Sequence, residues 1–134
     1  MRRLLPRTAT LVVLSALISC ASFAITITHG PMLGHVTKDS IRVWARTSDA
    51  GAFVVEYVEA DEVGAADWSK STISDPVLTA IPNDNTGWTT LTALNSGTKY
   101  HYRVWAFNGQ LGEGGTFHTL PAAEAYANPE YNPA

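Results

Sequence analysis

Cysteine is almost absent from this sequence, since Cys20 is the only one among 134 residues. An internal disulfide is therefore excluded, and with it the class of small exported domains that disulfides hold together. Long hydrophobic runs are also missing, because the longest, Leu11 to Ile18, is too short to span a bilayer as a helix. With 46% hydrophobic residues, the chain can instead build one domain around an ordinary core.

The first residues have the pattern of an export signal. Arg2, Arg3 and Arg7 form a basic start, and the short apolar run that follows is typical of a signal peptide. We therefore expect residues 1–24 to be a signal peptide and the protein to be exported, to the periplasm or to the cell surface.

The end of this signal allows two kinds of processing. Residues 17–20, Leu-Ile-Ser-Cys, resemble a bacterial lipobox, in which Cys20 becomes the lipidated first residue and serves as a lipid anchor. Ordinary cleavage after Ala24 is the alternative, because Ser22 and Ala24 are small residues at suitable places. With a lipid anchor, an outer-membrane lipoprotein is one option, because Ala21 stands in place of the aspartate that retains many lipoproteins at the inner membrane.

Basic residues are scarce in the rest of the chain. Removal of the three signal arginines leaves six of the nine basic residues against twelve acidic ones, a formal charge of −6. Because phosphate binding draws on clustered Lys and Arg, nucleic acid is not an expected partner.

Catalytic and metal-binding patterns are missing as well. The four histidines, His29, His35, His101 and His118, occur singly, without a second ligand at the usual spacings. Neither a Gly-x-Ser-x-Gly elbow nor a phosphate-binding glycine loop is present, and the acidic residues of segment 59–67 lack the spacing of a calcium loop. We therefore expect no catalytic residue, no metal ligand and no cofactor in this chain.

Regular breaks at Gly, Asn, Asp or Pro every eight to twelve residues, with alternating segments between them, are typical of a β-sandwich. The pattern predicts an all-β, fibronectin type III-like or immunoglobulin-like Greek-key sandwich of about seven strands over residues 25–120. Pro76 should place its strand at a sheet edge. The expected strands are 25–29, 40–46, 52–59, 69–80, 87–93, 98–107 and 114–119.

Alternation within these strands assigns the side chains to faces. The inward rows should contain Ile41, Val43, Ala45, Phe53, Val55, Tyr57, Tyr100, Tyr102, Val104 and Ala106. Several apolar residues then face outward, which is typical of a surface that another domain or partner covers. The predicted domain-docking surface consists of Trp105, Phe107, Val54, Val58 and Trp44.

The stretch LNSGTKYHYRVWAF, residues 94–107, resembles the tyrosine corner of Greek-key sandwiches. Leu94 should fill the core at the corner, Gly97 should let the chain turn, and the Tyr100 hydroxyl should bond to the backbone a few residues upstream. These three residues are predicted to be structural and to carry no chemistry.

Three segments together, ITHGPMLGHVTKDSIRVWARTSDAG, LNSGTKYHYRVWAFNGQ and GTFHTLP, resemble the N-terminal domain of bacterial alkaline phosphatase D-like (PhoD-like) phosphatases and phosphodiesterases. The matching residues include His29-Gly30-Pro31 at the entry, Val43-Trp44 and Tyr100, and they span nearly all of residues 25–121. A departure occurs at 34–36, where Gly-His-Val stands in place of the Gly-Asp-Pro of many relatives.

The resemblance implies an exported chain with a fibronectin-like domain, followed by a larger metallophosphatase domain that hydrolyses phosphate mono- or diesters with metal ions such as calcium and iron. We expect this chain alone to be inactive and its sandwich to pack on and position that catalytic domain, which is absent from residues 1–134. Residues 121–134 read as a linker-like tail.

A second hypothesis belongs to another class of protein. The chain would then be a free-standing, lipid-anchored module that binds a polysaccharide or a protein partner. The linker-like tail favours the first hypothesis.

Overall fold

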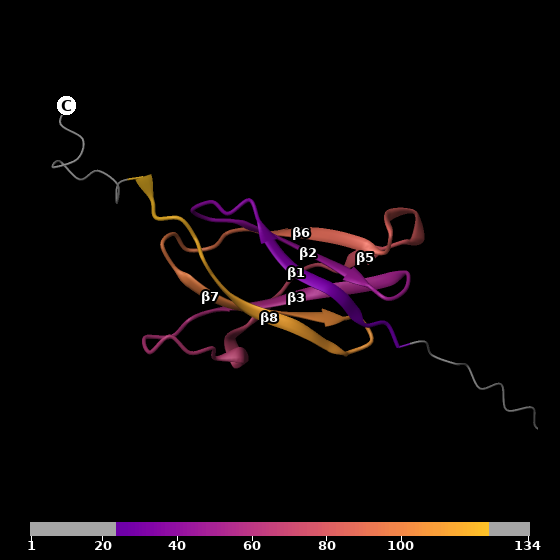
Figure 1. The fold of residues 1–134 in the computed structure, drawn as a ribbon. Coiled ribbons are helices and arrows are strands. Elements are labelled where there is room, and N and C mark those ends of the chain that lie inside the picture. Colours follow the sequence, from indigo (N-terminus) through magenta and orange to yellow (C-terminus); the bar gives the residue numbers. More distant parts are fainter. Residues whose placement is uncertain (1–23, 124–134) are drawn as a thin grey trace, which may run out of the picture.

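The computed structural model describes residues 24–123, which fold as two packed β-sheets (Figure 1). The signal peptide with Cys20 and residues 124–134 of the tail lie outside this range, so these predictions remain expectations. The strands are β1 (Ile27–Gly34), β2 (Ile41–Thr47), β3 (Gly51–Glu59), β4 (Thr72–Ile73), β5 (Val77–Thr79), β6 (Thr86–Leu91), β7 (Lys99–Ala106) and β8 (Leu111–His118). Two short 3-10 helices, η1 (Trp68–Lys70) and η2 (Ile81–Asn83), lie in the connections.

All strand pairs are antiparallel. One sheet has the order β1-β2-β6, and the other has the order β4-β3-β7-β8, with β5 also paired to β3. This arrangement confirms the predicted fibronectin type III-like sandwich. Eight strands occur in place of about seven because segment 69–80 divides around Pro76 into β4 and β5, two short strands at the edge of β3.

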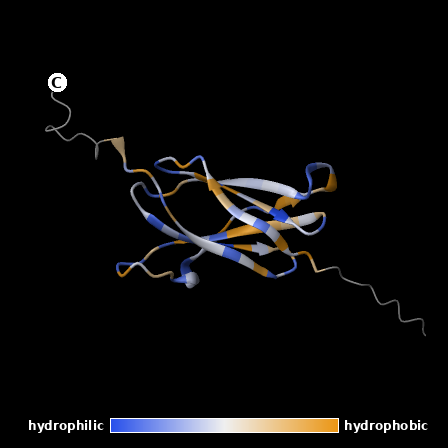
Figure 2. Ribbon diagram, in the orientation of Figure 1, coloured by the Kyte–Doolittle hydropathy of each residue, from blue (hydrophilic) through white to orange (hydrophobic). Residues whose placement is uncertain are grey.

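The core lies between the sheets, and the predicted inward rows fill it. Val43, Phe53, Val55 and Val104 are fully buried, and burial of each such side chain contributes about 1.5–3 kcal/mol. Tyr57 is the member of the predicted rows that is only partly buried. Hydrophobic and hydrophilic residues alternate along the strands, as Figure 2 shows.

Strand β1 is longer than the sequence predicts, because it continues past Gly30-Pro31 to Gly34. Its pairing with β2 is irregular on both sides of His29. As an edge strand, β1 tolerates a proline that donates no ladder hydrogen bond. Gly30 has a φ of +91°, and a Cβ there would come within 2.9 Å of the Trp44 carbonyl oxygen, so both conformation and space require glycine.

The described chain enters and leaves the sandwich at opposite ends (Figure 1). The N-terminal pole contains Ile25 together with the β2–β3, β5–β6 and β7–β8 connections, and Ser48 donates there to the Thr26 carbonyl. The C-terminal pole contains the β1–β2 turn, where Leu120 donates to the Thr37 carbonyl. Within residues 24–123, no helix has the length and apolar character needed to cross a membrane.

Candidate docking surface

The tyrosine-corner residues form a structural unit at the start of β7. The Tyr100 hydroxyl accepts a 2.9 Å hydrogen bond from the Asn95 backbone N–H. Leu94 is buried, and Gly97 has a φ of +61°, a conformation that favours glycine. Burial raises the pKa of Tyr100, so its hydroxyl stays protonated around neutral pH. Leu94 and Tyr100 also line an open hollow of about 400 Å³, and the hydrogen bond to Asn95 gives the Tyr100 hydroxyl a structural role there.

A metallophosphatase centre does not fit the described part of the chain. Residues 24–123 contain no group of three or more His, Cys, Asp or Glu residues that could hold a metal ion. His101 donates through Nε2 to the Gly64 carbonyl at 2.9 Å. In the acidic segment, Asp61 accepts backbone hydrogen bonds within its own loop, and Asp67 caps η1 by accepting from the Ser69 N–H.

The outer face of β3 and β7 carries a buried carboxylate, Glu56, which is only 7% exposed. Its Oε2 accepts from Arg103 Nε at 2.6 Å and from Trp105 Nε1 at 2.7 Å, while Oε1 accepts from Ser71 Oγ at 2.6 Å. Glu56 and Arg103 are paired across the two strands. Three donors from two segments, strand β7 and the connection between η1 and β4, thus converge on one side chain, so Trp105 is held in a fixed orientation.

Charge at this carboxylate is balanced within the cluster. The hydrogen bond from Arg103, with those from Ser71 and Trp105, outweighs burial and lowers the pKa of Glu56 to about 2. Arg103 in turn lies 4.0 Å from the Trp68 ring centroid and 5.0 Å from that of Trp105. The guanidinium is therefore paired with Glu56 and packed against two indoles.

An open, largely apolar hollow of about 480 Å³ adjoins this cluster. Val54 and Trp105 contribute from the sheet, Ile73 from β4, and Phe107 from the β7–β8 turn. Ile73 and Phe107 are 60% and 65% exposed. Exposed apolar side chains around a fixed indole resemble the core of a protein interface more than a solvated surface. We call this hollow the β3–β7 hollow.

The structure brings together three of the five predicted surface residues and separates the other two. Val54, Trp105 and Phe107 line the β3–β7 hollow. Trp44 lies in β2, on the other sheet, where it pairs with Trp88. Val58 is only 6% exposed, and its prediction as a surface residue was wrong. The segment after β3 folds back over this end of the strand, as the bond from His101, opposite Val58, to Gly64 shows.

Sequence reasoning missed Glu56, Ile73 and Trp68. A glutamate within an otherwise apolar strand was a usable signal, because a buried carboxylate requires donors and Arg103 was available in the neighbouring predicted strand. Ile73 and Trp68 gave no such signal, since their place depends on the path of the β3–β5 connection.

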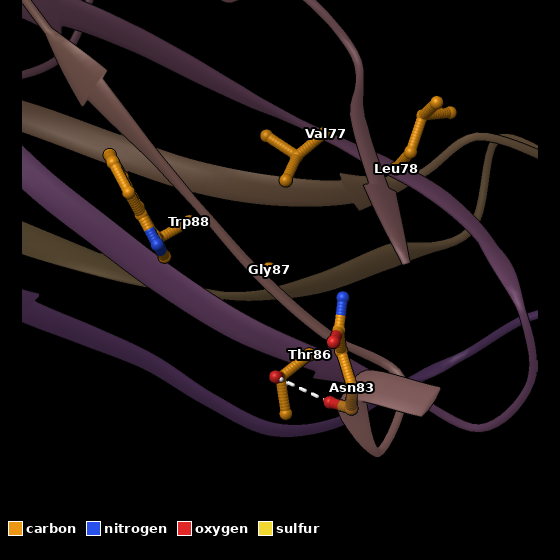
Figure 3. Close-up of a pocket in the computed structure, with 6 residues that line it drawn as sticks. All are labelled: Val77, Leu78, Asn83, Thr86, Gly87 and Trp88. Carbon is orange, nitrogen blue, oxygen red and sulfur yellow. Dashed lines mark hydrogen bonds between the residues drawn. The ribbon is translucent and has the colours of Figure 1, made fainter. Parts of the chain in front are cut away.

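A second hollow, of about 560 Å³, lies between β5, η2 and β6. Figure 3 shows its lining around Gly87, whose missing side chain leaves room for Val77. Thr86 donates a hydrogen bond to the Asn83 carbonyl at 2.7 Å. Trp88 is 55% exposed, and the Arg42 guanidinium lies 4.0 Å from its ring centroid. None of its lining residues is titratable, so the lining supplies no acid or base that could activate the Thr86 hydroxyl.

Comparison with known proteins identifies the family. The N-terminal domain of PhoD-like phosphatases matches residues 15–121, which is most of the chain. No curated protein sequence matches.

Solved structures share the fold at low sequence identity. The sensor domain of the anti-sigma factor RsgI4 of Pseudobacteroides cellulosolvens is 16% identical, with a TM-score of 0.52 over 74% of this chain and 95% of that one. A redesigned β-sandwich protein is 23% identical, with a TM-score of 0.50 over 69% of this chain and 93% of that one. The structure of PhoD is 17% identical, with a TM-score of 0.51 over 67% of this chain and only 18% of that chain. The similarity to PhoD thus covers a small part of that protein. On the family match over residues 15–121, this chain belongs to the family of PhoD-like phosphatase N-terminal domains.

Proposed function

We propose that this sandwich is the non-catalytic N-terminal domain of an exported PhoD-like phosphoric ester hydrolase, and that it packs on and positions a metallophosphatase domain. The observation that carries the proposal is the β3–β7 hollow on a domain of this family. Interfaces gain most of their energy from a few well-held aromatic anchors. Trp105, fixed by Glu56, and the exposed Phe107 have this character.

The position of the C-terminal pole is compatible with such docking. Strand β7 has eight residues, so Phe107 lies roughly 27 Å along the sheet from the pole at which the chain leaves. The fourteen residues from 121 to 134 can extend over at most about 50 Å. A domain that follows them can therefore fold back onto the hollow.

Export is part of the same proposal. The protein acts in the periplasm or at the cell surface, either as a lipoprotein anchored through Cys20 or after cleavage behind Ala24. The basic start and the short apolar run of residues 1–24 support this address.

The first experiment measures the native product with an antibody raised against residues 25–121, on a blot of whole cells of the source organism. A band several times larger than the 134-residue chain supports the proposal. A band at the size of the mature chain contradicts it.

A second experiment tests catalysis directly. The purified 134-residue chain should hydrolyse neither a phosphate monoester nor a diester such as bis-p-nitrophenyl phosphate, with calcium and iron added. Turnover that a chelator abolishes would overturn the non-catalytic assignment.

A free-standing, lipid-anchored module that binds a polysaccharide or a protein is the second candidate. Trp88 favours it, because this exposed indole with its stacked Arg42 lies outside the β3–β7 hollow and offers a separate aromatic surface. Depletion of the purified chain from solution by insoluble cell-wall polysaccharide, and loss of this binding in Trp88→Ser, would support it.

A further inference from the structure

The N-terminal pole carries exposed apolar side chains from β5, from the β5–β6 connection and from the β7–β8 turn. Leu78 in β5 is 80% exposed, Ile81 in η2 is 77% exposed, and Phe107 in the β7–β8 turn is 65% exposed. Leu78 and Phe107 also line an open apolar hollow of about 610 Å³ together with Ile25. The exposed apolar surface therefore continues to the point at which the chain enters the sandwich.

The residues that precede this point limit how far the pole can lie from an anchor. Cys20, the predicted lipid-modified residue, is five residues before Ile25. Five residues extend over at most about 18 Å. A lipid on Cys20 would hold the N-terminal pole next to the bilayer, at a high effective concentration for any weak contact.

Charge distribution shows what kind of contact this would be. All three described lysines, Lys38, Lys70 and Lys99, lie away from this pole, in the β1–β2 turn, in η1 and at the start of β7. At the pole, the Arg46–Asp84 ion pair, with its 2.7 Å bond, balances its own charge, and Asp49 is exposed. The pole thus lacks the basic residues that attract proteins to anionic lipids, and its contact would be apolar.

We propose that the N-terminal pole rests on the lipid bilayer, with Leu78 and Ile81 inserted at the boundary between headgroups and acyl chains. This proposal rests on the lipid-anchored form of the proposed function. Membrane-surface insertion of this kind needs only a few apolar side chains once an anchor supplies the first attachment. The β3–β7 hollow then faces along the membrane and remains free for a catalytic domain.

The test uses the full chain, purified as a lipoprotein and placed in vesicles of phosphatidylethanolamine with phosphatidylglycerol. Because lipidation blocks the thiol of Cys20, Leu78→Cys or Ile81→Cys introduces the only free thiol. The measurement is the rate of labelling by a charged maleimide that does not enter membranes. Both variants should react roughly tenfold more slowly in vesicles than in detergent, because lipid shields an inserted side chain from an aqueous reagent.

Val63→Cys is the matched control, because Val63 is 87% exposed in the loop after β3, at the other end of the sheet. It should react at the same rate in vesicles and in detergent. Protection at 78 and 81 should also persist at high salt and in vesicles without phosphatidylglycerol. Equal labelling rates of the cysteines at positions 78, 81 and 63, in vesicles that retain the chain, would overturn the proposed bilayer contact and leave the lipid anchoring intact. A chain that carries no lipid and does not stay with the vesicles would overturn both the bilayer contact and the lipid anchoring. The blot would still test the link to a catalytic domain separately.

Discussion

The Trp105 indole nitrogen donates a 2.7 Å hydrogen bond to Glu56, a carboxylate that the sheet and the β3–β4 connection bury. This bond joins a buried carboxylate of the outer face to an indole that lines the β3–β7 hollow. It makes Trp105 part of the folded framework as well as part of the exposed hollow. Changes at these residues should therefore affect stability and docking to different extents.

Glu56→Gln should destabilise the protein, because the amide keeps the size of the side chain and removes the charge that Arg103, Trp105 and Ser71 surround. We expect the free energy of unfolding to fall by about 1–3 kcal/mol. Urea denaturation at pH 7 measures it. The control is Glu113→Gln, an exposed glutamate in β8, which should change the value by less than about 0.5 kcal/mol. Equal stability of both variants would refute the role given to Glu56.

Stability should also decrease in acid. The pKa of Glu56 is lowered from 4.5 to about 2 in the folded state, so its contribution is complete above the unfolded value and is lost as pH falls through the folded one. The free energy of unfolding should therefore decline between about pH 5 and pH 2. Glu56→Gln should flatten this decline. Some slope should remain, because the hydrogen bond from Ser69 lowers the pKa of Asp67 in the same direction.

Tyr100→Phe should weaken the tyrosine corner, because the Asn95 N–H loses its 2.9 Å acceptor. We expect a loss of about 1–2 kcal/mol in thermal or urea unfolding. Tyr102→Phe is the matched control: Tyr102 is as buried, but its hydroxyl forms no hydrogen bond within the described residues. A larger loss in the control than in Tyr100→Phe would contradict this account of the corner.

The two aromatic residues of the β3–β7 hollow should separate folding from docking. Phe107→Ser should leave stability within about 0.5 kcal/mol, because Phe107 is exposed in a turn. Trp105→Phe should cost about 1–2 kcal/mol through the lost bond to Glu56. In a native product that carries a catalytic domain, Phe107→Ser should increase protease cleavage between the domains. Unchanged cleavage would argue against docking at this hollow.

Much of the fold could be predicted from the sequence, because alternation and turn residues act locally. Val43 and Val55 took their predicted inward places, since each follows from period-two geometry within one strand. The extent of β1 could not be predicted this way. Gly30-Pro31 normally ends a strand, and only the edge position of β1 lets the pairing resume beyond it.

The candidate site was harder to predict for a related reason. Alternation correctly placed Trp105 on the outer face, but it does not say what covers that face. Val58 and Glu56 are buried because the segment between β3 and β5 folds back over them. The residues that cover them, such as Ser71, lie outside the strand whose alternation was used for the prediction. Ile73 and Trp68 were missed for this reason, since long-range covering by an irregular segment leaves no periodic signal.

The opposite poles have a mechanical consequence. Strands β1 and β8 both run from the N-terminal pole to the C-terminal pole, and each is held to one neighbour by antiparallel pairing. Tension between the two ends of the domain would act along these strands, at right angles to their ladder hydrogen bonds. Such a load shears many bonds at once and does not peel them apart one by one. A domain that joins a fixed point to a mobile one in this way would resist extension and transmit force between them.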